Sequence, residues 1–168
     1  QRTSTLWAVV AVFVISSIVF LSPLKGFLVL VPVLSGIAFN IVFMYLMNIP
    51  YDIITISFSS IAVGAGVDDA IHFTLRYRKY RKKNPSKGVR KALYHTIAVT
   101  GRPIILTSLS VVLGMSILGF ASYTPVRYFG LLMAVTLMGC MMSTLIFVPA
   151  LTILFSRIKR LFLFRKRY

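Results

Sequence analysis

The sequence predicts an all-α membrane protein, a polytopic bundle of five transmembrane helices with an amphipathic connector helix on the cytoplasmic side. The chain of 168 residues is 58% hydrophobic and only 13% charged, which is too apolar and too poor in charge for a soluble domain. Apolar runs of about 20 residues, the length that crosses a bilayer, recur along it. The basic residues lie between and after these runs.

The apolar runs are predicted to be helices, because the alternation typical of membrane barrel strands is absent and a helix satisfies its own backbone groups in lipid. We expect spans at residues 6–21, 27–47, 53–75, 103–121 and 128–155. Together they form a transmembrane domain over residues 1–156. A basic tail, 157–168, follows the last span.

The connections differ in length and chemistry. Pro or Gly breaks the chain at 22–26, 48–52 and 122–125, which predicts short turns. The connector 76–102 is longer and basic. Its 86–100 part is predicted to form an amphipathic helix, since Val89, Ala92, Leu93, Thr96 and Ile97 fall on one helical face. The chain begins with Gln1 and has no visible signal peptide, so we expect it to be a piece of a longer protein.

The distribution of Lys and Arg predicts the orientation. With five spans, one side of the membrane holds Lys25, ten cations of the connector and six of the tail, which is 17 of the 19. The positive-inside rule makes that side cytoplasmic. We therefore expect the amino end of the chain outside and the carboxyl end in the cytoplasm. The net charge of +16 then indicates topology, and no nucleic-acid partner is expected.

Two adjacent carboxylates lie within the third predicted span. The chain has only three acidic residues, and Asp68 and Asp69 are two of them. Asp68 precedes Arg76 by eight residues, about 12 Å along a helix, so it is expected near the middle of the hydrocarbon core. An ionisable group at that depth costs roughly 3 kcal/mol. Such a cost is typical of ion or proton handling, or of a buried structural pair.

The spacing of polar and small residues around the acids predicts a proton relay of Asp68, Asp69 and His72. Gly64, Asp68 and His72 are four residues apart and share one helical face, whose small residues would let another helix approach closely. Asp69 points about 100° away. Desolvation and like-charge repulsion both disfavour two ionised neighbours. A carboxyl group near neutrality can exchange protons as water access alternates.

Other interpretations of these residues stay open. Asp68 could instead pair with a cation from another part of the protein. His72 could lie at the interface and only donate a hydrogen bond. Three hydroxyls near the carboxylate depth of the fourth span, those of Thr107, Ser108 and Ser110, are predicted to support the site, although such groups often bond their own helix.

Enzyme chemistry is not predicted. The glycines near the acids lie inside a span and form no phosphate loop, and no nucleophile has a base at a plausible spacing. The two histidines and the aspartates do not form a convincing metal site. Cys140 is a lone cysteine in an apolar run and is predicted to be a small packing residue. No cofactor is expected, and protons are expected to serve as the coupling ion.

Three motifs resemble the resistance-nodulation-division (RND) superfamily, in particular its MMPL-like hydrophobe and lipid exporters and the related sterol-sensing-domain proteins. The motifs are GAGVDDAIHFTLRYR at 64–78, TGRPIILTSLSVVLGMSILGFA at 100–121, and the start and end of the last span, Phe129-Gly130 and Val148-Pro149-Ala150-Leu151. The first is similar to the family pattern of Gly, three residues, Asp, then Tyr or Asp. The resemblance covers nearly the whole chain.

The resemblance implies the last five helices of the second six-helix repeat of an RND-type exporter. It implies proton-motive-force-driven export of hydrophobic or lipid-like molecules across the bacterial cytoplasmic (inner) membrane, with Asp68 in the proton pathway. Asp69 then either titrates or replaces a hydrogen-bonding Tyr. The implied partners are membrane lipids, the N-terminal transmembrane repeat and extracytoplasmic domains of the same protein, and a further copy in a homo-oligomer. The alternatives are a lipid- or sterol-sensing module without vectorial transport, and a structural scaffold.

Overall fold

The computed structural model describes residues 23–50 and 52–165, together with a few single residues before them. All regular secondary structure in those ranges is helical, which confirms the predicted all-α class. The first predicted span, 6–21, and the end of the basic tail lie outside the described residues apart from isolated positions.

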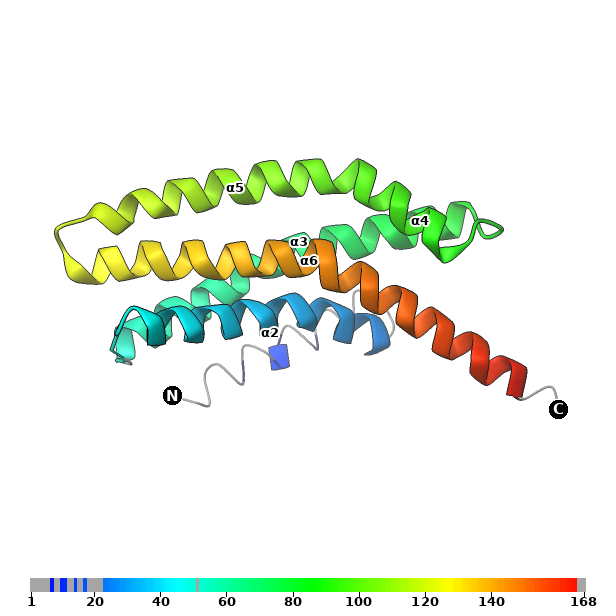
Figure 1. Ribbon diagram of the computed structural model, residues 1–168, viewed down its shortest axis with the longest axis horizontal. Helices are drawn as coiled ribbons and strands as arrows, with labels where there is room; N and C mark the ends of the chain where they lie inside the picture. Colours follow the sequence, from blue (N-terminus) through cyan, green and yellow to red (C-terminus); the bar gives the residue numbers. More distant parts are fainter. Residues whose placement is uncertain are drawn as a thin grey trace.

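A helix covers most of each predicted span from 27–47 onward. The main helices are α2 (Pro23–Leu46), α3 (Ile53–Lys83), α4 (Val89–Thr96), α5 (Arg102–Ile117) and α6 (Thr124–Arg165) (Figure 1). A π-helical turn, Ile97–Gly101, joins α4 to α5, and a 3-10 turn, Leu118–Phe120, follows α5.

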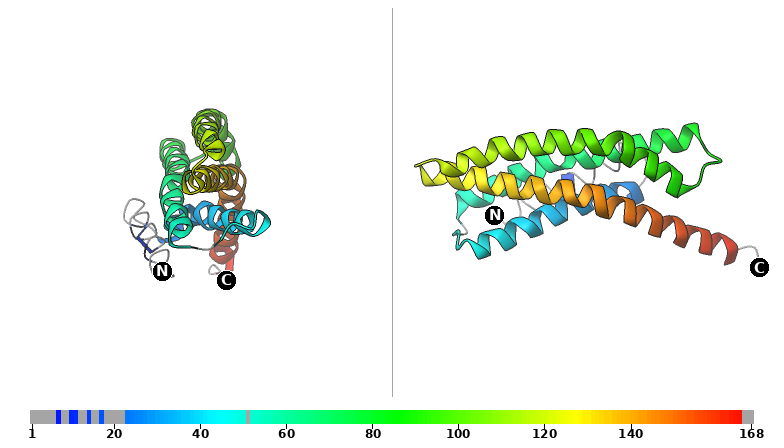
Figure 2. Two further views of the ribbon diagram at one scale, coloured as in Figure 1. Left: turned by 90° about the vertical axis from the view of Figure 1, so that its left-hand side faces the viewer. Right: turned by 45° about the horizontal axis from the view of Figure 1, so that its top comes forward.

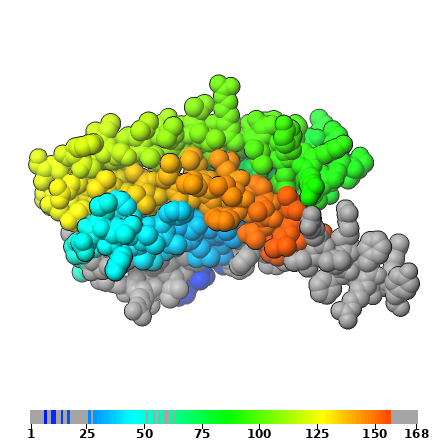
Figure 3. Space-filling model, viewed as in Figure 1, coloured from blue at the N-terminus to red at the C-terminus, as the bar shows by residue number. Residues whose placement is uncertain are grey.

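Helix α6 is the centre of the bundle. It contacts α2, α3 and α5, and the two further views in Figure 2 show it running between them. The space-filling view shows α6 between α5 on one side and α2 on the other (Figure 3). Close approach at the centre depends on small residues: a Cβ atom added to Gly36 of α2 or to Gly66 of α3 would lie 2.4 Å from the Sγ atom of Cys140. Cys140 is fully buried, as predicted for a small packing residue.

The interior of the bundle is largely apolar and contains a few buried polar side chains. One buried cluster, Val29, Val33, Val67 and Ala70, joins α2 to α3. A second joins α3, α4, α5 and α6, and consists of Phe73, Leu93, Ile104, Met141 and Val148. Deep between α2 and α6, the amide of Asn40 donates to the hydroxyl of Thr136 at 2.7 Å. Burial without such a partner would be costly for this amide.

Two residues, Asn48 and Asp52, shape the turn before α3. Asn48 has a φ of 51°, in the left-handed region that Asn tolerates better than most residues. Asp52 then caps α3: its carboxylate accepts from the Thr55 amide at 2.8 Å, and its own amide donates to the Thr55 hydroxyl at 3.1 Å. This reciprocal arrangement is a capping box. The predicted turn at 48–52 is thus present.

Helix bounds differ from the prediction at several places. Helix α3 continues to Lys83, eight residues beyond the predicted end of its span at residue 75. The predicted turn at 22–26 is largely helical, because α2 begins at Pro23, a residue suited to a first turn. The predicted amphipathic part of the connector contains α4, in which Ala92, Leu93 and Thr96 are buried, whereas Ile97, predicted on the same face, is exposed. The helix continues through the π-helical turn into α5 without a break. Helix α6 continues through most of the predicted tail, with Pro149 inside it, and it changes direction in its orange part in Figure 1.

Three stretches of the described residues are long and apolar enough to cross a membrane: Leu28–Leu46, Val89–Phe120 and Thr124–Ser156. They correspond to the second, fourth and fifth predicted spans. Many large apolar side chains of α5 and of the 3-10 turn after it are exposed, among them Leu113 and Ile117 of α5 and Phe120 of the turn, which suits contact with lipid. Crossing by α3 and by the first predicted span stays a prediction.

Candidate functional site

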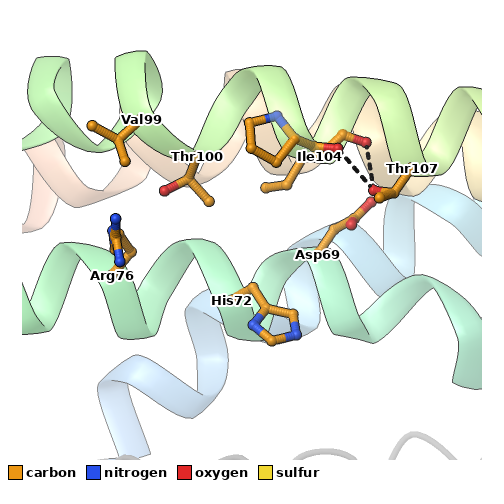
Figure 4. Close-up of a pocket in the computed structure, with 8 residues that line it drawn as sticks. Asp69, His72, Arg76, Val99, Thr100, Ile104 and Thr107 are labelled. Carbon is orange, nitrogen blue, oxygen red and sulfur yellow. Dashed lines mark hydrogen bonds between the residues drawn. The ribbon is translucent and has the colours of Figure 1, made fainter.

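An open groove of about 390 Å³ lies between α3 and the helical segment that runs from the π-helical turn into α5. Three residues of α3 line it: Asp69, His72 and Arg76. Asp69 and Arg76 are seven residues apart, about two helical turns, so they lie on one face of α3. The opposite wall consists of Val99, Thr100, Pro103, Ile104 and Thr107. Figure 4 shows Asp69 and Arg76 directed toward that wall.

Asp69 is the carboxylate that contacts another helix. Its side chain is half-buried, and the hydroxyl of Ser108 on α5 donates to its Oδ2 atom at 2.6 Å. Ser108 itself is buried. A hydrogen bond that ends on a carboxylate is among the stronger ones in proteins, so this contact holds the acid side chain of α3 against α5.

The other two predicted supporting hydroxyls bond their own helix. Thr107 donates to the carbonyl of Pro103 at 2.9 Å and lies at 3.1 Å from that of Ile104, as the dashed lines in Figure 4 show. Ser110 donates to the carbonyl of Leu106 at 2.8 Å. Of the three hydroxyls, Ser108 is therefore the one in contact with a carboxylate.

Asp68 lies on a different face of α3. Gly64, Ala65, Asp68 and His72 are all exposed, and nothing lies within 4 Å of a Cβ atom added to Gly64. The His72 ring turns away from α5 (Figure 4), although His72 borders the groove. The expected helix against this face is absent from the described part of the chain.

The close approach between helices occurs on the opposite side of α3. Gly66 and Ala70 are buried, four residues apart, and Gly66 meets Cys140 of α6. Gly64 and Asp68 have the same four-residue spacing, and the sequence predicts the close contact on that face instead.

Two polar residues of the groove, Arg76 and Thr100, were not predicted. Arg76 follows Asp69 by seven residues, so its side chain lies on the same face about 10 Å further along α3. Thr100 belongs to the π-helical turn, and its buried hydroxyl finds no hydrogen-bond partner in the described part of the chain. Single π-helical turns are frequent at functional sites. The i+7 spacing could have identified Arg76, whereas no sequence pattern indicates the π turn.

The groove brings an acid and other polar groups together. A carboxyl, an imidazole and a guanidinium border one open hollow. Among the residues that the structure describes, no group of three His, Cys, Asp or Glu side chains is arranged to hold a metal ion.

Comparisons with known proteins point to one family. A model of the MMPL family matches residues 1–168. A membrane protein of Methanocaldococcus jannaschii is 30% identical over 157 residues, which are 94% of this chain and 40% of that protein. The apo-petrobactin exporter of Bacillus anthracis is 34% identical over 94 residues, 56% of this chain and 12% of the exporter. The chain thus spans well under half of either relative.

Proposed function

This chain belongs to the MMPL family, and from that premise we propose that it forms part of the transmembrane domain of an exporter driven by the proton-motive force. Its substrates are hydrophobic or lipid-like molecules, the class implied by its resemblance to hydrophobe and lipid exporters. The relative from Bacillus anthracis is named as an exporter, which supports transport as the activity. The protein resides in the cytoplasmic membrane in the orientation that the basic residues predict.

The observation that carries the proposal is the pair of adjacent acids with different surroundings. Asp69 is bonded to Ser108 at 2.6 Å, whereas Asp68 is exposed one position earlier. A relay needs one site connected to the aqueous groove and another that a moving part can cover and uncover. In our proposal Asp69 borders the groove, and Asp68 on the uncovered face meets a part of the full protein beyond this chain.

The two acids and His72 have separate roles in this proposal. Asp68 is the group charged and discharged in each cycle, in line with its place in the motif. Asp69, on the groove side of α3, shares the charge of Asp68 or holds that charge in position. His72 lies one turn beyond Asp68 and passes protons toward the end of α3. Each role makes a different prediction for substitution.

The test is transport by the full-length protein carrying Asp68→Asn or Asp69→Asn. Asparagine keeps the size of the side chain and removes the titrating proton. We expect Asp68→Asn to abolish transport driven by a proton gradient at normal expression, and Asp69→Asn to reduce it. Asp52→Asn is the matched control, because it removes the third acid while Asn still caps a helix well.

Unchanged transport with Asp68→Asn would refute the role assigned to Asp68. Ligand-dependent conformational change that persists after the proton gradient is collapsed, without transport, would instead indicate a lipid- or sterol-sensing module. If Asp68→Asn lowers the amount of folded protein, but the protein that folds still couples transport to the proton gradient, Asp68 only maintains helix packing.

A further inference from the structure

A second hollow, of about 360 Å³, lies at the end of α3, beyond the predicted span. It is lined mostly by cations and by polar and aromatic groups of α3, its carboxyl-terminal cap and α4: Arg76, Lys79, Tyr80, Lys83, Asn84 and His95. We call this hollow the basic pocket. It shares Arg76 with the carboxylate groove.

Contacts between aromatic side chains fix one wall of the basic pocket. The rings of Tyr80 and His95 stack with centroids 4.1 Å apart and planes 22° from parallel. The ammonium of Lys87 donates to the Tyr80 hydroxyl at 3.2 Å and lies 5.5 Å from the centre of its ring. Tyr80 is thus in contact with groups from α4 and from the loop, so the two helices meet at a defined geometry.

The charge of the basic pocket has no counterpart nearby in the sequence. Arg76, Lys79 and Lys83 follow each other at spacings of three and four, which places them on one face of α3. The ten Lys and Arg residues of 76–102 are accompanied by no Asp or Glu. Like charges at these spacings repel one another, so an anion between them would relieve the repulsion.

The depth of the basic pocket indicates the source of the anion. Lys79 and Lys83 follow Leu75, the last residue of the predicted span, by four and eight residues, about 6 and 12 Å along the helix. The headgroup layer of a bilayer is about 5 to 7 Å thick on each side of the hydrocarbon core. Lys79 therefore lies at the level of the lipid phosphates.

We propose that the basic pocket binds the phosphate of an anionic phospholipid from the leaflet on the side of the connector. Arg76, Lys79 and Lys83 supply the cationic donors, and the stacked pair of Tyr80 and His95 forms the side wall. Clusters of cations beside a membrane helix are typical of anionic lipid recognition. The proposal depends on the membrane placement of α3 and does not depend on transport.

The test is native mass spectrometry of the purified full-length protein in neutral detergent, titrated with phosphatidylglycerol or with phosphatidylcholine. The test variant is Lys79→Gln with Lys83→Gln; Arg76 is left unchanged because it also borders the groove. The matched control is Lys82→Gln with Lys91→Gln, two exposed cations outside the pocket. Both double variants lose the same charge.

We expect phosphatidylglycerol to bind the unmodified protein in preference to phosphatidylcholine. The pocket variant should bind it about 30-fold more weakly, since each cation beside an anionic headgroup is worth a factor of about five. The control pair should bind as the unmodified protein does, and Lys79→Arg with Lys83→Arg should retain binding. Equal weakening in both glutamine pairs would overturn the proposal in favour of diffuse attraction.

Inorganic phosphate, titrated without lipid, distinguishes the source of the anion. Weak binding relative to phosphatidylglycerol supports a lipid site, because the acyl chains add contacts with the apolar surface of the helices. Binding of inorganic phosphate as tight as that of the lipid, lost in the pocket variant, would overturn the lipid assignment.

Discussion

At the scale of single residues, the position of each side chain around α3 decides its surroundings. Asp68 and Asp69 are adjacent in sequence, yet one is exposed and the other is half-buried and bonded to Ser108. One step along a helix turns the side chain by about 100°. The candidate site is therefore asymmetric, and its two acids should respond differently to substitution.

Ser108→Ala tests the contact between the two helices. A hydrogen bond to a charged group contributes about 1.5 to 3 kcal/mol, so we expect the free energy of unfolding to fall by about that amount. Thermal unfolding of the purified full-length protein measures it. Thr107→Ala and Ser110→Ala are matched controls, because both hydroxyls bond carbonyls of their own helix. Equal destabilisation by all three changes would contradict the contact.

At the scale of helices, a capping residue sets where α3 begins, and a small residue sets how closely α3 packs against its neighbour. Asp52 shows the first effect through its capping box with Thr55, and Gly66 shows the second through its approach to Cys140. The pattern of small residues alone did not tell which glycine faces α6, because both Gly64 and Gly66 lie in the same stretch.

Asp52→Ala is expected to loosen the start of α3. Loss of an N-cap costs about 1 kcal/mol, which corresponds to amide exchange about five times faster near Thr55. Hydrogen–deuterium exchange of peptides from this region measures the rate. Asp52→Asn, which can accept the same hydrogen bond from the Thr55 amide, should exchange at the original rate. An unchanged rate in Asp52→Ala would mean that the cap contributes nothing there.

Gly66→Ala is expected to destabilise the centre of the bundle. The added Cβ atom would lie 2.4 Å from the Sγ atom of Cys140 and 2.9 Å from its Cβ atom, and overpacking of this kind costs about 1 to 3 kcal/mol. Gly114→Ala on α5 is the control, because nothing lies within 4 Å of its added Cβ atom. That change should be neutral or stabilising, since Ala favours a helix by up to about 1 kcal/mol over Gly. A lower thermal midpoint for Gly114→Ala than for Gly66→Ala would contradict the packing described.

At the scale of the whole molecule, α6 provides the packing surface for α2, α3 and α5, while α5 exposes much of its apolar side. One face of α3, with Asp68, stays uncovered in the described part of the chain. The chain spans 40% of one relative and 12% of the other. In the proposed exporter, a part of the full protein beyond this chain covers that face.

The predicted orientation can be tested with single cysteines in a cysteine-free full-length protein. We expect Tyr123→Cys, in the turn before α6, to react with a membrane-impermeant maleimide in intact cells. Lys87→Cys, in the loop between α3 and α4, should react only after the cells are permeabilised. Both positions are exposed, so the difference in labelling reports sidedness. The reverse pattern would invert the topology.

The sequence by itself determined the helical class, the approximate bounds of α2, α3, α5 and α6, and the family, because apolar runs, breakers and motifs are local properties of the chain. It also singled out Asp68 and Asp69, whose roles stay predictions. Only the tertiary structure decided that Asp69 faces α5, that Ser108 is its donor, that Gly66 rather than Gly64 meets α6, and that a basic pocket lies between α3 and α4. Each of these depends on how a helix is rotated about its own axis, and that rotation is set by the packing of all its neighbours at once.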